Sequence, residues 1–295
     1  MSIIDEFGFL PVKLKFDSAD YVIYPVDNFD ELEKDIKKYV NLDGFIYPPQ
    51  IYSAELDPVT FQKISRIPNS ERPAHLYRMP ASHNIESKQD DDKNKEDVRS
   101  TFFSFIMHML GYIYGTRLQF HDWWFDGRIA FEGQHNITIS EENLKKFIEY
   151  SLNTFKPWQD NDQKFFINIL YMHNRSPSYE WDWERFTIEY MVFDACWKFS
   201  KLTRVPHTER IKRICEEYGL YYNQDAVDRI VRLRNDLFHE ALWSRNQPGT
   251  AAEAQDFMAS YNLRRLNHRV IPSLLGYTSS YIKSNWTDIG CYDFD

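Results

Sequence analysis

Arg234, Asn235 and His239 lie close together in a segment whose apolar residues recur with the spacing of an amphipathic helix. The helical repeat places Arg234 within the apolar stripe, although a guanidinium keeps its charge at physiological pH. At such a position it needs a carboxylate, a cluster of carbonyl groups or a bound anion as its partner. Asn235 and His239 are four residues apart, so they project from one face, about 100° around the helix from Arg234. An imidazole titrates near neutral pH, and His239 therefore suits proton transfer.

The sequence from Arg234 to His239 has the form R-N-x-x-x-H. It resembles the R-x4-6-H signature of the HEPN superfamily of helical nucleases, in which a polar residue often follows the arginine. Residues 232–240 resemble the motif helix of Apea-like HEPN domains, and residues 186–197 resemble the earlier helix that carries an inward acidic residue. The resemblance covers about residues 140 to 285 and implies nothing about residues 1 to 100.

The resemblance implies RNA cleavage that requires no metal or other cofactor. Attack by a 2′-hydroxyl needs a base, an acid for the leaving 5′-oxygen and positive charge at the phosphate, and it leaves a 2′,3′-cyclic phosphate. His239 would transfer protons, Arg234 would bind the non-bridging oxygens, and Asn235 could orient the phosphate or the imidazole. One helix offers only one histidine. By the resemblance, two such helices face each other across a homodimer and form a composite site.

Asp194 is the first candidate for the acidic residue that holds Arg234 through a bidentate pair, and Glu189 is the second. The alternative for Asp194 and Arg234 is a buried ion pair that only fixes helix packing. Likewise His239 could be a surface or core histidine, and Asn235 a surface amide.

Four further arginines are candidates for RNA binding. The chain carries a net charge of −9, but the segment from Lys198 to Lys283 has 14 basic and 9 acidic residues. This segment includes one arginine on the motif helix and a compact basic group on the last predicted helix, and either could follow a phosphate backbone or be a solvated helix face. The four candidates are Arg232, Arg264, Arg265 and Arg269.

The elements that position these residues are predicted to be helices almost throughout from Arg99 onward. We expect a last helix that Pro272 kinks or breaks near its middle, a helix start at Ser140 and a helix end at Gly219. The predicted ranges are 100–114, 140–155, 160–173, 181–202, 208–218, 224–242 and 250–283.

The N-terminal part reads as a small α+β module. Alternating or short apolar runs predict strands within residues 12–16, 21–24 and 45–47, and a capped amphipathic helix is expected after Asn28. The fold class is therefore mainly α, with a C-terminal HEPN-like helical bundle. We expect an N-terminal module over residues 1–82 that could sense or regulate, a charged linker over residues 83–98 and a helical domain over residues 99–295.

Composition narrows the class of protein. The 295 residues are 43% apolar and 27% charged, which is typical of a globular chain rather than a disordered one. The three cysteines are widely spaced and predict neither a disulfide framework nor a zinc ribbon. No signal peptide and no membrane-spanning segment are expected, which favours a cytoplasmic location.

The sequence thus predicts a homodimeric, metal-independent endoribonuclease. By the resemblance alone it would be a toxin or abortive-infection effector in antiviral defence, restrained by an antitoxin or inhibitor protein. The alternative is a non-catalytic HEPN protein that serves as a dimerisation or nucleic-acid-binding scaffold, and a weaker one is a nuclease or binder directed at DNA.

Overall fold

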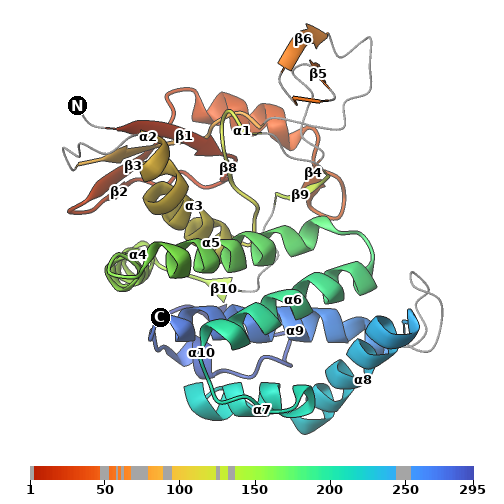
Figure 1. The fold of residues 1–295 in the computed structure, drawn as a ribbon. Coiled ribbons are helices and arrows are strands. Elements are labelled where there is room, and N and C mark those ends of the chain that lie inside the picture. The colour runs from red at the N-terminus through yellow and green to blue at the C-terminus, as the bar shows by residue number, and fades with distance from the viewer. Residues whose placement is uncertain are drawn as a thin grey trace. The chain divides into compact units, whose positions relative to one another are not determined.

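The computed structural model describes residues 3–46, 53–57, 59–60, 63–67, 79–88, 95–123, 127–131, 137–243 and 254–295. The protein is mainly helical, with a small antiparallel sheet near the N-terminus (Figure 1). Two compact units divide the chain, and each is described by itself. The first contains residues 1–103 and 114–134, and the second contains residues 104–113 and 135–295. The predicted boundaries at 82 and 99 differ from this division, because the chain returns to the first unit after residue 113.

A five-stranded antiparallel sheet, in the order β2-β3-β7-β1-β8, forms the first unit's framework. Its strands are β1 (Ile4–Gly8), β2 (Phe16–Asp17), β3 (Tyr21–Pro25), β7 (His83–Ser87) and β8 (Gln119–Phe120).

The predicted charged linker is wrong for its first five residues, because they form β7 between β1 and β3. His83, Ile85 and Ser87 alternate toward the buried side of the sheet. Two of these three inward residues are polar, so composition concealed the alternation. The segment Lys95–Val98 at the other end of that prediction forms the short helix α2, and residues 89–94 lie outside the described residues.

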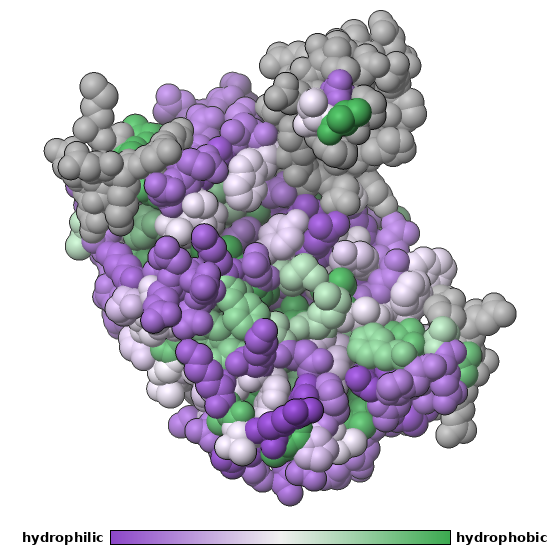
Figure 2. All heavy atoms as spheres, viewed as in Figure 1, coloured by the Kyte–Doolittle hydropathy of each residue, from purple (hydrophilic) through white to green (hydrophobic). Residues whose placement is uncertain are grey.

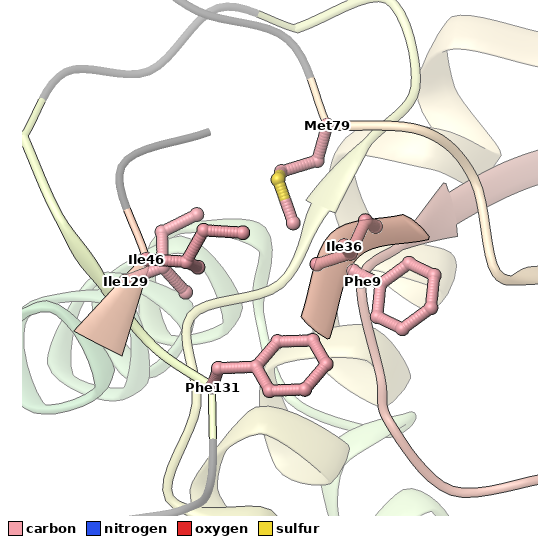
Figure 3. Packing of buried hydrophobic residues seen from close by; sticks show 6 residues of the cluster. All are labelled: Phe9, Ile36, Ile46, Met79, Ile129 and Phe131. Atoms are coloured by element: carbon pink, nitrogen blue, oxygen red, sulfur yellow. The ribbon is translucent and has the colours of Figure 1, made fainter. Parts of the chain in front are cut away.

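An aromatic and aliphatic cluster fills a second part of this unit (Figure 3). The ring of Phe9 stacks on both Phe29 and Phe131, with centroid distances of 5.8 and 5.7 Å. The cluster is built from α1 (Phe29–Lys37), from the loop after β1 and from the strand pair β4 (Phe45–Ile46) and β9 (Ile129–Ala130). A further pair joins β5 (Ser53–Leu56) and β6 (Lys63–Ile67).

His83 is buried within this unit and has a protein partner for each ring nitrogen. The backbone N–H of Leu14 donates to Nε2 at 3.1 Å, and Nδ1 lies 2.9 Å from Ser82 Oγ. Nε2 is therefore an acceptor, and the ring proton is on Nδ1. Burial lowers the pKa of His83 to about 4.

Helices make up most of the second unit, together with the short parallel pair of β10 (Ile137–Thr138) and β11 (Tyr292–Asp293). The first helix of the second unit follows a π-helical turn at Arg99–Phe103, which belongs to the first unit. The helices are α3 (Ser104–Tyr114), α4 (Glu141–Phe155), α5 (Asp160–Arg175), α6 (Asp182–Phe199), α7 (His207–Tyr218), α8 (Gln224–Glu240), α9 (Ala254–Leu274) and α10 (Ser280–Lys283), with a 3-10 turn at Ser176–Ser178.

Local signals fixed several helix ends. Ser140 caps α4 by accepting from the backbone N–H of Asn143 at 3.2 Å, and Gly219 ends α7 with φ of +63°. Both predicted ends are confirmed. The single predicted helix over 250–283 is wrong, because α9 and α10 are separated by a turn at Gly276, where φ is +74°. Pro272 lies near the end of α9 rather than in the middle of a longer helix.

Helix α6 lies at the centre of this unit and packs against α5, α8 and α9 (Figure 1). Its buried residues point in several directions and include the charged Glu189.

Helix α7 packs against α8. On the face drawn in Figure 2, apolar residues occur in several small areas between polar ones. The motif helix α8 therefore packs against α6, α7 and α9, and Asn235, Phe238 and His239 near its end are exposed.

Candidate functional site

Helix α8 presents the motif because its two faces differ. Asn223 caps the helix by accepting from the backbone N–H of Ala226 at 3.0 Å. Val227, Ile230 and Leu233 are buried against the neighbouring helices. The next residue, Arg234, is half-buried, and Asn235 and His239 are exposed. The apolar face thus anchors the helix, and the motif lies at its edge.

The structure brings the three motif side chains together. Nη1 of Arg234 lies 3.1 Å from Asn235 Oδ1 and 2.9 Å from His239 Nε2. A guanidinium can only donate, so Nε2 of His239 is the acceptor and the proton of the neutral ring is on Nδ1. Cation, amide and imidazole therefore share one point on the protein surface.

Two aromatic rings support the guanidinium. Arg234 lies 5.8 Å from the ring centroid of Tyr190 on α6 and 5.3 Å from that of Phe238, and these two rings meet edge-to-face. Burial raises the pKa of the Tyr190 phenol to about 12, and Asp194 adds to the rise, while the charges of Arg234 and Arg210 and a hydrogen bond with Arg234 oppose it. Sequence reasoning missed Tyr190, although it lies one helical turn before Asp194 and so shares its face.

Asp194 was our first candidate to hold Arg234, and the structure gives it different partners. Its Oδ1 lies 2.8 Å from Arg210 Nη1 and 4.0 Å from His207 Nδ1, both on α7. Arg234 meets α6 one turn earlier, at Tyr190. The start of α7 therefore takes the carboxylate that we assigned to the motif.

Glu189, the second candidate, is the inward acidic residue of α6 and is fully buried. Its carboxylate lies 2.8 Å from Arg264 Nη1, 2.8 Å from Asn267 Nδ2 and 3.0 Å from His173 Nδ1. Burial alone would raise the pKa of Glu189, but His173, Arg264 and Asn267 lower it to about 2. Burial lowers the pKa of His173 and outweighs the effect of the carboxylate. We conclude that Arg264, Asn267 and His173 hold an ionised Glu189 in the core, and that none of the motif residues is its partner.

Two of the four arginines predicted to bind RNA lie in the interior. Arg264 binds Glu189, and Arg269 is 1% exposed, with Nη2 2.8 Å from Ser284 Oγ and its guanidinium 4.4 Å from the Tyr281 ring centroid. Neither can follow an RNA backbone, and these two assignments are wrong. The reason is that α9 is buried on most sides, so its basic residues serve packing. Arg232 and Arg265 are half-buried and keep some exposed surface.

No protein-family model, no curated protein and no solved structure matches this chain. Within the part of the chain that the structure describes, no helix is long and apolar enough to cross a membrane. No group of three or more His, Cys, Asp or Glu side chains placed to hold a metal ion occurs among those same residues.

Proposed function

We propose that this protein is a metal-independent endoribonuclease whose site is formed by Arg234, Asn235 and His239. The observation that carries the proposal is the pair of hydrogen bonds from the Arg234 guanidinium to Asn235 and His239 at the surface of α8. A planar cation beside an imidazole can bind a phosphodiester and move a proton at the same point.

The bond between Arg234 and His239 indicates how a phosphate would enter. In the free protein the Nε2 lone pair of His239 accepts from the guanidinium. A phosphate oxygen is a stronger acceptor, and it would replace Nε2 as the partner of Arg234. His239 can then be protonated at Nε2, donate to the same phosphate and give its proton to the leaving 5′-oxygen. Asn235 would hold the guanidinium in place during this exchange.

The homodimer, the inhibitor and the setting are part of the same proposal and rest on the resemblance to HEPN nucleases. Phe238, which contacts Tyr190, and Met191, which follows Tyr190 in the chain, are both exposed apolar side chains. They support a second copy of the chain as a partner at this surface. We propose that RNA is the substrate, that an antitoxin or inhibitor protein restrains cleavage, and that the protein acts in the cytoplasm as an antiviral toxin.

The test is cleavage of total cellular RNA by the purified protein in excess EDTA. Arg234→Ala and His239→Ala should abolish cleavage, and the wild-type products should carry 2′,3′-cyclic phosphates. A substrate with a 2′-deoxy sugar at the cut position should resist, since it lacks the nucleophile. Arg213→Ala and His121→Ala change exposed residues outside the motif and serve as matched controls.

Cleavage that survives in both motif variants would contradict the proposal. Binding of RNA by a folded dimer without turnover would instead favour the scaffold function, with the same residues holding phosphate. Equal cleavage of the 2′-deoxy substrate would favour a nuclease directed at DNA.

A further inference from the structure

His207, the first residue of α7, is affected by the charge of Arg234 but has no role in the motif so far. Its Nδ1 is 4.0 Å from Asp194 Oδ1, and its side chain is 42% exposed. Asp194 also binds Arg210, one turn further along α7, at 2.8 Å. One carboxylate on α6 therefore fixes the position of the first turn of α7.

The position of Asp194 relates His207 to Arg234. Tyr190 and Asp194 are four residues apart on α6, so their Cβ atoms are neighbours on one face, about 6 Å apart. Tyr190 contacts Arg234, and Asp194 faces His207. His207 on α7 therefore lies within electrostatic range of Arg234, which His239 contacts on α8.

Three buried nitrogen atoms on α7 and α8 make no hydrogen bond. Within the described residues these are His207 Nδ1, which lies 4.0 Å from Asp194 Oδ1, Arg210 Nε and Arg234 Nε, and other polar atoms of the core share this property. A buried polar atom without a hydrogen bond has few explanations, and a catalytic role is one of them.

The charges around His207 favour its neutral form. Burial lowers its pKa, and the charges of Arg210 on its own helix, Arg234 on α8 and Arg204 in the preceding loop lower it further. The carboxylate of Asp194 on α6 opposes them. A neutral imidazole is the form that a general base requires.

We propose that His207 is the general base of RNA cleavage and that it acts within the same chain as the acid His239. This inference rests on the proposed function. The imidazole of His207 takes the proton of the 2′-hydroxyl, the 2′-oxygen bonds to phosphorus, and the bond from phosphorus to the 5′-oxygen breaks. His239 gives its proton to that 5′-oxygen. The products are a 2′,3′-cyclic phosphate and a 5′-hydroxyl, and solvent restores the protonation of both histidines.

In this inference both histidines of a site, His207 and His239, come from the same chain. In the composite site that the resemblance implies, the second histidine comes from the partner copy. Asp194 is a positioning residue for His207 and Arg210 in this arrangement. It orients the imidazole without touching the substrate.

The experiment compares the pH dependence of kcat/KM for the wild type, His207→Gln, Asp194→Asn and the surface control His121→Gln. A base must be deprotonated, so it controls the limb on which the rate rises with pH. We expect His207→Gln to lower kcat/KM by about 100-fold or more and to remove that limb. Asp194→Asn should shift the limb with a smaller loss of rate, and His121→Gln should match the wild type.

A second measurement does not depend on turnover. In protein labelled with ¹³C and ¹⁵N at histidine, a short RNA with one 2′-deoxy sugar at the cut position should shift the ring signals of both His207 and His239. Thermal melting and circular dichroism of each variant confirm that the fold is retained.

The outcomes separate this inference from the function on which it rests. A His207→Gln variant that keeps the wild-type rate and the rising limb, while His239→Ala is inactive, overturns the inference alone and leaves the partner's second histidine as the base. A ring shift at His239 without one at His207 does the same. A folded wild type that cuts no RNA overturns the proposed function and, with it, the role of His207.

Discussion

At the scale of single residues, the contact between Arg234 and His239 would couple charge to proton transfer under the proposed function. In the structure the guanidinium donates to the Nε2 lone pair of the imidazole. Its aromatic neighbours Tyr190 and Phe238 limit the directions in which it can move. For its proposed role, Arg234 therefore needs the planar shape of a guanidinium as well as a positive charge.

Arg234→Lys tests this point directly. Lysine keeps the charge but has no planar set of donors that reaches both Asn235 and the phosphate. We expect kcat/KM for RNA cleavage to fall by about 100-fold or more, close to the loss in Arg234→Ala. Arg213→Lys, on the exposed side of α7, should change nothing. Near-normal cleavage by Arg234→Lys would mean that charge alone is enough.

Glu189 allows a prediction about stability. Glu189→Gln leaves the buried Arg264 without a carboxylate, so we expect a loss of about 3 to 5 kcal/mol in the free energy of unfolding. Glu216→Gln is the control, since its ion pairs on α7 are exposed and their loss should cost less than about 1 kcal/mol. Urea denaturation of the three proteins measures both values. Equal midpoints would show that the buried pair adds no stability.

At the scale of elements, the residue that ends a helix contributes measurably to the free energy of unfolding. Gly219 ends α7 with φ of +63°, and a Cβ placed there would have no atom within 4 Å. Gly219→Ala should therefore cost about 1 to 2 kcal/mol through backbone strain alone. Gly290→Ala, where φ is not positive and a Cβ would make ordinary contacts, should cost close to nothing. Thermal melting compares the two, and an unchanged melting temperature for Gly219→Ala would contradict the strain.

The elements that could be predicted are those with local signals. The start of α4 at Ser140 and the end of α7 at Gly219 depend on residues within one turn. The strand β7 depends on partners far along the chain, β1 and β3, of which local patterns carry no record. The separation of α9 from α10 does have a local signal, the turn at Gly276, and the predicted single helix overlooked it.

The residues of the candidate site also differ in whether a local pattern or distant packing places them. Arg234, Asn235 and His239 could be grouped from the sequence because one helix holds all three. Which carboxylate faces which arginine is set by how α6, α7 and α9 pack, so the assignments of Asp194, Arg264 and Arg269 had no local basis.

At the scale of the whole molecule, buried histidines make stability depend on pH. His83 has a pKa of about 4 when folded, below the ordinary value of 6.5, and burial also lowers the pKa of His173 and His268. The unfolded chain gains these protons first, so acidification favours unfolding. For His83 alone we expect a loss of up to about 3 kcal/mol between pH 6.5 and pH 4.

Urea denaturation at pH 7.5, 6.5, 5 and 4 measures this loss. His83→Gln should flatten the pH dependence of the first unit, and the exposed His121→Gln should leave it unchanged. A pH dependence that is identical in the wild type and His83→Gln would mean that His83 is not kept neutral by burial.

The proposed homodimer gives a prediction at the same scale. Phe238→Glu adds a charge beside the motif and should shift the mass measured by light scattering from dimer toward monomer. Ile289→Glu, at a side chain that is 64% exposed elsewhere in the second unit, is the control and should leave the mass unchanged. A stable Phe238→Glu dimer would place the contact between copies elsewhere.

The buried carboxylate of α6 also bears on how the chain is synthesised. Glu189 leaves the ribosome 75 residues before Arg264 and 78 before Asn267, the partners that stabilise its charge. Until α9 emerges, the nascent helices can enclose Glu189 only as an ion without its arginine or as a neutral acid, and either form costs free energy. We therefore expect the helical unit to close late in translation, and a premature stop before α9 to yield a chain that cannot complete its core.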